Sequence, residues 1–125
     1  MTQVAEADDK DRARVLTTAT LRAAEALELT GKELGGVLGV SEPSVSRLRR
    51  GDYRLEEGSK AFELAALFVR LFRSLDAITA GDCQVASAWL RNENKALGGR
   101  PINQIQTITG LTHGLAYLDS RRAPL

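Results

Sequence analysis

Residues Leu34 to Arg50 read LGGVLGVSEPSVSRLRR, and this stretch decides the fold. It places Gly35 and Gly36 inside an otherwise helical pattern and a third glycine, Gly39, three residues later. Each glycine inside a helix costs about 0.5 to 1 kcal/mol relative to alanine, so something must need the missing side chains. We expect that a second helix packs closely against the first.

The residues around Gly39 carry the start and stop signals of two short helices. Thr30 can cap a helix over residues 31–38, and Gly39 suits the left-handed conformation that ends one. Ser41 can cap a second helix over residues 42–50. The sequence therefore predicts two short helices joined by a tight turn.

Apolar residues at three- and four-residue spacing predict helices through the rest of the chain. We expect one helix from Arg14 to near Leu29, a long one over residues 60–78 and one capped by Asp82. A short helix over residues 102–105 and a last one capped by Thr109 should follow. The predicted fold class is all-α, with an N-terminal helix-turn-helix bundle followed by a small helical domain.

The composition limits the classes of function. Seventeen Lys and Arg residues against sixteen Asp and Glu residues give a formal net charge of +1, so any DNA contact must come from local clusters. A single cysteine, Cys83, rules out an internal disulfide or a thiolate zinc cage and fits a reducing cytosol. We see neither a signal-peptide pattern nor an apolar run of about 18 residues, which predicts a cytoplasmic protein without a membrane segment.

No catalytic constellation is recognisable in the sequence. There is no nucleophile with a histidine partner and no phosphate-cradling glycine loop. The lone His113 lies in a helical pattern without a second ligand nearby, so packing at the surface is favoured over a metal or catalytic role. We expect neither an enzyme nor a bound cofactor or metal.

The spacing that starts at Gly31 resembles the helix-turn-helix of phage-repressor-like regulators, the Xre class. Gly39 falls on the turn glycine of that motif, and Gly35 falls where its two helices touch, although alanine is more usual there. The apolar positions that match the buried positions of the motif are Leu34, Leu38, Val40, Val45 and Leu48. The resemblance implies a DNA-binding domain.

The chemistry of residues 42–50 agrees with this interpretation. With the apolar residues turned inward, the polar side chains lie on the outside of a helix that a DNA major groove admits. Glu42 could accept from cytosine, Arg47 could pair with guanine, and Ser46 could reach either kind of base edge. The residues better placed for phosphates are Thr30, Lys32, Ser44, Arg49, Arg50 and Arg54. The alternative is that these arginines only solvate the helix end and complement its dipole.

The predicted helix over residues 60–78 is apolar on two sides, so both sides should be buried. One interpretation is a self-association surface, with Phe68, Leu71 and Phe72 in the contact of a homodimer. The other is a central helix that joins the two halves of the chain in its interior.

The segment WLRNENKALGGRPINQIQTITGLTHGLAYLDSRR, residues 89–122, resembles the Xre/MbcA/ParS toxin-binding domain of antitoxins from RES-type toxin systems. The matching elements are Trp89-Leu90, Asn92, Asn94, the run Leu97 to Pro101, Gly110, Leu115 and Tyr117-Leu118. The resemblance implies a docking surface for a RES-type toxin that consumes NAD. The residues we assign to this surface are Arg100, Pro101, Tyr117, Ser120, Arg121, Arg122 and Leu125.

The end of the chain, residues 119–125, is expected to project from the body. Helical periodicity is lost near Leu118, and Pro124 cannot continue a helix. The resemblance implies that this end blocks the toxin. Its arginines could pair with a catalytic carboxylate while the terminal carboxylate occupies a phosphate-binding position.

These observations predict an antitoxin of a type II toxin–antitoxin system that covers the active site of its toxin and represses its own operon. The expected partners are a RES-type toxin, operator DNA and a second copy of the chain, in a higher toxin–antitoxin assembly. We expect a mobile arm over residues 1–12, the DNA-binding domain over 13–58 and the dimerisation and toxin-binding domain over 59–125. The alternatives are a stand-alone transcriptional regulator whose C-terminal half only dimerises, and an adaptor that binds protein but not DNA.

Overall fold

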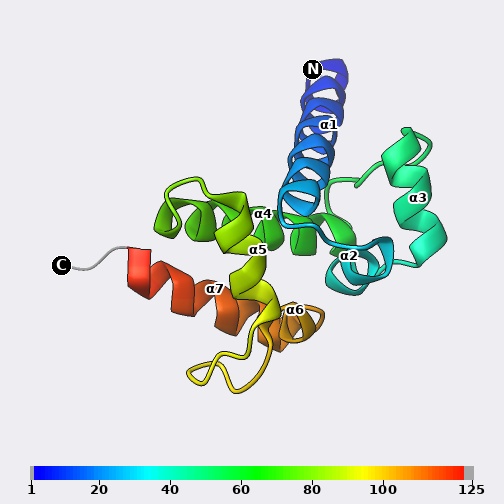
Figure 1. Cartoon of the computed structure of the whole chain (residues 1–125). Coiled ribbons are helices and arrows are strands. Elements are labelled where there is room, and N and C mark those ends of the chain that lie inside the picture. Colours follow the sequence, from blue (N-terminus) through cyan, green and yellow to red (C-terminus); the bar gives the residue numbers. More distant parts are fainter. Residues whose placement is uncertain (1, 123–125) are drawn as a thin grey trace.

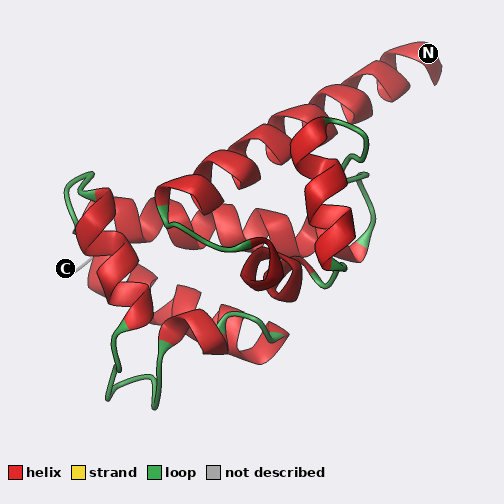
Figure 2. Cartoon of the chain, turned by 45° about the vertical axis from the view of Figure 1, so that its right-hand side comes forward, coloured by secondary structure: helices red, strands yellow, loops and turns green. Residues whose placement is uncertain are grey.

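A computed structural model describes the backbone of residues 2–122 and the side chains of residues 10–122. In this part of the chain the backbone forms helices and no strand, apart from an isolated bridge between Asn94 and Gly99 (Figure 1 and Figure 2). The helices are α1 (Thr2–Ala26), α2 (Gly31–Leu38), α3 (Glu42–Arg50), α4 (Lys60–Ile78), α5 (Cys83–Arg91), α6 (Pro101–Gln104) and α7 (Ile108–Arg122). The predicted all-α class is confirmed. None of these helices is both long enough and apolar enough to cross a membrane.

Capping hydrogen bonds fix the starts of α2 and α3. The Thr30 hydroxyl accepts from the Glu33 amide at 3.1 Å, and the Glu33 carboxylate accepts from the Thr30 amide at 2.9 Å. The Ser41 hydroxyl accepts from the Ser44 amide at 3.2 Å in the same way. Between them Gly39 has φ 71° and ends α2. The caps and the turn glycine that the sequence predicted are confirmed.

The two glycines inside α2 make room for two different neighbours. A Cβ on Gly35 would lie 2.7 Å from the Val40 carbonyl oxygen and 3.6 Å from Val45 Cγ2, so its absence admits the turn and α3. A Cβ on Gly36 would fall on the side-chain amide of Gln106, which comes from the turn between α6 and α7. The expected close helix contact is confirmed at Gly35. Gly36 instead admits a side chain from the C-terminal half, which the local pattern gave no reason to expect.

Helix α4 crosses the middle of the molecule and joins its two halves (Figure 1). It contacts α1 and α2 of the N-terminal half and α5 and α7 of the C-terminal half. Phe68 and Leu71 are both 0% exposed and belong to one core cluster that includes side chains from every other helix. The predicted homodimer contact at these two residues is therefore corrected, because the second apolar side of α4 is covered by the chain itself. Phe72 is half-buried against the same cluster.

Helix α1 begins far earlier than the sequence predicted. It starts at Thr2, so residues 2–12, which were expected to form a mobile arm, are helical. This segment contains two alanines and one each of glutamine, glutamate, lysine and arginine, whose high helix propensity favours continuation of the helix. At its other end α1 stops at Ala26, three residues before the predicted end, because Glu28 takes a left-handed conformation with φ 59°.

Helix α7 also differs from the prediction at both ends. Its first turn is capped by Thr107 and not by Thr109, since the Thr107 hydroxyl accepts from the Gly110 amide at 3.0 Å. The helix continues to Arg122, so residues 119–122 do not form the start of a projecting peptide. Asp119 holds this last turn on α4, where it accepts from the Ser74 hydroxyl at 2.7 Å. Residues 123–125 lie outside the described part of the chain.

Candidate functional site

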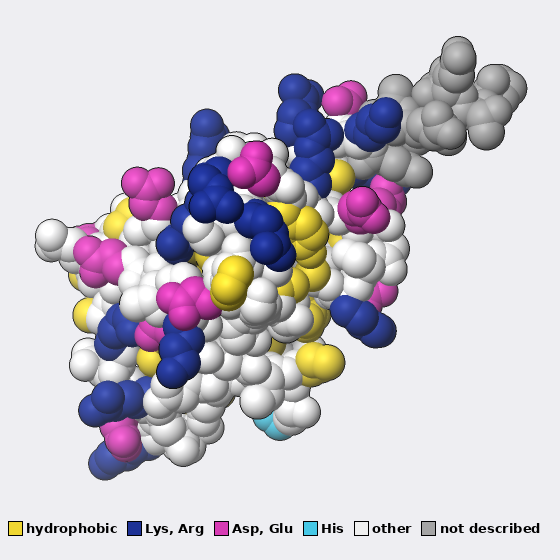
Figure 3. Space-filling model, turned by 90° about the vertical axis from the view of Figure 1, so that its right-hand side faces the viewer, with side chains coloured by type: hydrophobic (Ala, Val, Ile, Leu, Met, Phe, Trp, Pro, Cys, Tyr) yellow, Lys and Arg dark blue, Asp and Glu magenta, His cyan; other side chains and the backbone are white. Residues whose placement is uncertain are grey.

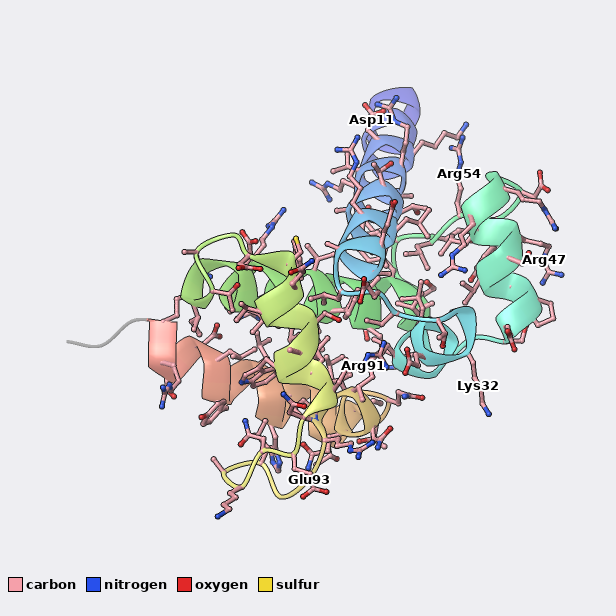
Figure 4. All side chains as sticks on the ribbon, in the orientation of Figure 1. Asp11, Lys32, Arg47, Arg54, Arg91 and Glu93 are labelled. Atoms are coloured by element: carbon pink, nitrogen blue, oxygen red, sulfur yellow. The ribbon has the colours of Figure 1, made fainter. Side chains whose placement is uncertain are left out.

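The outer side of α3 carries the polar side chains that the sequence placed there. Val45 and Leu48 are buried in the core, whereas Glu42, Ser46 and Arg47 are exposed. Arg47 points away from the helical body (Figure 4). A helix with such a face fits a major groove, where arginine pairs with guanine and a carboxylate accepts from cytosine.

Neighbouring oxygens orient the arginines of α3. The half-buried Ser44 shares a hydrogen bond of 2.9 Å with the Ser41 hydroxyl and accepts from Arg47 Nη2 at 3.0 Å. Arg50 Nε lies 3.3 Å from Asp52 Oδ2, in an ion pair whose side chains are 61% and 64% exposed. Exposed pairs of this kind contribute little to stability, so Arg50 can exchange its carboxylate for a phosphate.

The other residues predicted to bind phosphates surround α3. Thr30 caps α2, and Lys32 in the first turn of α2 points away from the body (Figure 4). Arg49 Nη2 lies 3.5 Å from the Leu29 carbonyl oxygen, and Arg54 follows α3 in the chain. Lys and Arg side chains gather on the face that α2 and α3 form (Figure 3). The predicted DNA-binding residues therefore lie on α2 and α3 or directly beside these two helices.

One residue on this side was missed from the sequence. A hollow of about 330 Å³ between α1 and the end of α3 is lined by Arg14 together with Arg49, Arg50 and Arg54, and by Tyr53. Four arginines line this hollow, and arginine suits a backbone phosphate. Two of them also pair with carboxylates, Arg14 with Asp11 at 3.2 Å and Arg50 with Asp52 at 3.3 Å. Arg14 stands 35 residues before Arg49 in the sequence, so no local pattern connects it to the cluster.

The C-terminal half presents a second candidate surface, which begins at the loop between α5 and α6. Asn94 and Gly99 are bridged across this loop by a hydrogen bond of 2.8 Å, and Gln104 Nε2 donates to the Leu97 carbonyl oxygen at 2.5 Å. Arg100 is exposed at the end of the loop. Pro101 is buried as the first residue of α6, which corrects its assignment as a docking residue: it starts the helix instead.

Aromatic and cationic side chains continue this surface along α7. The Tyr117 ring stacks on Trp89 with centroids 6.4 Å apart, and the Arg121 guanidinium lies 5.9 Å from the centroid of the Tyr117 ring. Beside Tyr117 a hollow of about 560 Å³ is lined by Leu97 and His113, among others. Tyr117 and Arg121 thus offer a combined apolar and cationic contact to a partner.

Of the three remaining residues predicted at this surface, the structure describes Ser120 and Arg122. Ser120 is exposed, and its hydroxyl donates to the Tyr117 carbonyl oxygen at 2.7 Å. Arg122 is exposed but leans on α4, where it donates to the Ser74 hydroxyl at 3.3 Å. Leu125 lies outside the described residues.

A polar junction connects the two candidate surfaces. Arg91 at the end of α5 donates to both Glu33 carboxylate oxygens, at 2.6 and 2.9 Å, and to the Glu28 carbonyl oxygen at 2.8 Å. Its guanidinium lies between α5 and α2 (Figure 4). The hydrogen bonds from Arg91 hold the pKa of Glu33 below its usual value, although partial burial acts in the opposite direction. The buried Ser87 adds a second link, since its hydroxyl donates to the Leu27 carbonyl oxygen at 3.1 Å.

Within residues 10–122, no three His, Cys, Asp or Glu side chains are grouped as a metal site would require. His113 is exposed, as is the thiol-bearing Cys83.

Two family models match the chain. The antitoxin Xre-like helix-turn-helix domain matches residues 6–70, and the antitoxin Xre/MbcA/ParS C-terminal toxin-binding domain matches residues 74–123. No curated protein gives a significant match. The first match contains α2, α3 and the arginine-lined hollow, and the second contains α5, α6 and α7. Both resemblances found in the sequence are thereby confirmed.

Proposed function

The chain belongs to the antitoxins with an Xre-like helix-turn-helix domain, and on this premise we propose that it silences a RES-type toxin and represses its own operon. The two matched domains make it an antitoxin with a DNA-binding and a toxin-binding part, and antitoxins of these families are not enzymes. The identity of the toxin and the way in which the antitoxin inhibits it are proposed here. In this proposal, residues 13–58 form the DNA-binding part, and residues 59–125, which begin with α4, form the dimerisation and toxin-binding part.

The exposed face of α3 supports the proposed repression. Glu42, Ser46 and Arg47 would read base edges, while the cations around α3 would hold the helix on the backbone phosphates. The net charge of the chain is only +1, so affinity for DNA has to come from this local cluster. Binding to an operator that overlaps the promoter of the antitoxin's own operon would then block transcription.

Replacing Arg47 by alanine is expected to weaken operator binding by about 1 to 3 kcal/mol and to relax the preference at one base position. Arg49→Ala and Arg14→Ala should instead weaken binding to all sequences alike. Each should also reduce the slope of the logarithm of the binding constant against the logarithm of the salt concentration by about one, because one phosphate contact is lost. Gel-shift titration on the operator and on scrambled DNA at several salt concentrations measures both effects. Lys95→Ala, which removes an exposed cation from the loop between α5 and α6, is the charge-matched control. An unchanged base preference for Arg47→Ala would contradict the assignment.

The surface of the C-terminal half supports the proposed action on the toxin. Arg100, Tyr117 and Arg121 are positioned for contact with a partner, and an enzyme that consumes NAD needs a concave polar site. Arginines that reach such a site could pair with its carboxylate. Because α7 remains helical to Arg122, we propose that Arg121 reaches the toxin from the end of a helix.

Two variants test this action separately. Arg121→Ala should weaken toxin neutralisation about tenfold or more, because a charge-assisted contact is lost, whereas removal of residues 123–125 should relieve inhibition while binding persists. Copurification with the product of the adjacent gene measures binding, and survival of toxin-expressing cells measures neutralisation. Arg22→Ala, an exposed change on α1, is the control. Full protection by both variants would leave coverage by the body of the domain as the mechanism. Absence of any copurifying toxin would favour the stand-alone regulator.

A further inference from the structure

The orientation of the DNA-facing helix α3 depends on α2. Of the described helices, only α2 packs along α3 over several residues. Their contact is close, because a Cβ on Gly35 of α2 would lie 3.6 Å from Cγ2 of Val45 on α3 and 2.7 Å from the Val40 carbonyl oxygen in the turn between them. Whatever holds α2 in place therefore also sets the direction in which α3 points.

Gln106 of the C-terminal half contacts α2 at Gly36. The half-buried side chain of Gln106 comes from the turn between α6 and α7, and its Nε2 donates to the Ile102 carbonyl oxygen at 3.0 Å. A Cβ on Gly36 would overlap Oε1 of Gln106 and would lie 2.9 Å from its Cδ. Glycine lowers the helix propensity of α2 relative to alanine, so Gly36 is explained by the side chain that it admits.

Arg91 holds the same helix one turn earlier. Its two hydrogen bonds to Glu33 are directional contacts with a residue that also caps α2 through the Thr30 amide. Glu33 and Gly36 are three residues apart, which places both contacts on one face of α2. Helix α4 packs on α2 as well, but hydrophobic burial is non-directional, whereas the polar contacts define the rotation of α2 about its own axis.

Both contacts cross from one matched domain to the other. Glu33 and Gly36 lie inside the helix-turn-helix match. Arg91 and Gln106 lie inside the toxin-binding match. Figure 4 shows α2 between the labelled Arg91 and Arg47, so Arg91 approaches α2 from the side away from the DNA-facing helix. Any effect of Arg91 on the proposed DNA contact must therefore pass through α2, and the contact of Gln106 with Gly36 leads to the same helix.

We propose that Arg91 and Gln106 are positioning residues for DNA binding, through which the C-terminal half sets the angle at which α3 enters the major groove. The proposal rests on the proposed binding of operator DNA by α3. It gives the toxin-binding half a part in operator recognition when no toxin is bound. A misplaced α3 loses hydrogen bonds to base edges first, because these bonds depend on distance and angle. Attraction to the phosphate backbone persists, so binding to unrelated DNA should change little.

Gel-shift titration of the full chain on operator and on scrambled DNA tests the proposal. Gln106→Ala and Gly36→Ala should each raise the operator dissociation constant about fivefold or more and leave binding to scrambled DNA nearly unchanged. The salt dependence of binding should be that of the unaltered chain, because no phosphate contact is lost. The double variant should bind no more weakly than the weaker single variant, since both changes remove the same contact.

Arg91→Lys provides a further variant that keeps the charge of the chain. Lysine cannot reproduce the planar two-bond contact of arginine with Glu33, so operator affinity should fall although the net charge is unchanged. Ser74→Ala is the control, because the hydrogen bonds of the buried Ser74 with Asp119 and Arg122 link α4 to α7. It should lower the stability without changing the preference for the operator. Thermal unfolding followed by circular dichroism gives the temperature below which every variant is folded, and the titrations are made there.

An unchanged operator preference in Gln106→Ala and Arg91→Lys would overturn the proposal. An equal loss in Ser74→Ala would also overturn it, because the effect would then follow general stability. If the unaltered chain does not prefer its operator, the proposed DNA binding fails and this inference fails with it. Operator binding by the unaltered chain that the variants retain in full contradicts the inference alone, so the two failures are distinguishable.

Discussion

Replacement of Phe68 by alanine should lower the free energy of unfolding by about 3 to 5 kcal/mol. The ring is fully buried at the middle of α4, and α4 is the helix that both halves of the chain pack against. Its removal leaves a cavity in the shared core, so both halves should lose stability together. For a domain of marginal stability this is a large fraction of the total.

Urea unfolding followed by circular dichroism measures the effect, with Phe62→Ala as the control. Phe62 is also on α4 but only half-buried, at a groove between α1 and α4, so its truncation should cost less than that of Phe68. Phe68→Asp separates an internal role from a dimer contact. A residue at a dimer surface would give a folded monomer, whereas a buried carboxylate without a partner should leave the chain largely unfolded. A folded Phe68→Asp monomer would contradict the core position.

The helices α2 and α3 were predicted correctly, whereas the partner of α4 was not, and both outcomes have the same physical cause. Helices α2 and α3 could be predicted because their determinants are local. Thr30 and Ser41 accept hydrogen bonds from amides three residues away, and Gly39 can adopt the left-handed conformation because glycine has no side chain. The pattern of α4 likewise predicted burial on two sides. It could not say whether a second copy or α7 covers the second side, because a period along one helix contains no information about its neighbour.

The ends of α1 and α7 show the limit of periodicity as a signal. Residues 2–12 carry no periodic pattern of large apolar side chains, yet α1 begins at Thr2. Helix propensity, and not periodicity, is the signal that favours a helix there. The last turn of α7 is held by Asp119, which bonds to Ser74 on α4. A polar tether between residues 45 positions apart leaves no trace in the spacing of apolar residues.

The residues of the candidate surfaces also fall into two groups, those that local sequence could predict and those that depend on long-range packing. The outer face of α3 followed from its own sequence, and the exposed positions of Glu42, Ser46 and Arg47 agree with it. Arg14 could not be placed beside Arg49 without the packing of α1 on the core. Glu33 could have been noted, because Thr30 followed three residues later by glutamate is the signature of a capping box. Its partner Arg91 is 58 positions away in the sequence, so the ion pair could not have been predicted from a local pattern.

Removal of the Arg91 guanidinium is expected to lower the free energy of unfolding by about 1 to 3 kcal/mol. Arg91 donates to both Glu33 oxygens and to the Glu28 carbonyl oxygen, with side-chain exposures of 37% for Arg91 and 19% for Glu33. Because Arg91 is on α5 and Glu33 is on α2, its loss acts on the junction between the DNA-binding and toxin-binding parts. Glu33 would keep its capping bond to Thr30 but would become a partly buried carboxylate without its cation.

Arg70→Ala is the control for loss of an arginine ion pair. Arg70 contacts Asp119 at 3.4 Å with side-chain exposures of 60% and 41%, so its removal should change the unfolding free energy by less than about 1 kcal/mol. Combining Arg91→Ala with Glu33→Ala closes a double-mutant cycle, and the coupling measures the ion pair apart from the capping bond. A coupling indistinguishable from zero would show that the junction does not depend on this pair.

The ion pair between Arg91 and Glu33 also predicts how the free energy of unfolding changes as the pH falls. Arg91 lowers the pKa of Glu33 from 4.5, so the folded state binds this proton less readily than the unfolded state does. The stabilisation is therefore fully present above about pH 4.5 and is lost as the pH falls through the lower pKa of the folded protein. In Arg91→Ala this contribution is already absent at neutral pH, so the difference in stability between the two proteins should shrink as the pH falls below 4.5. Thermal unfolding of both proteins between pH 7 and about pH 3 measures that difference. A difference that stays constant across the series would mean that Arg91 acts through Glu28 and packing, and not through the Glu33 carboxylate.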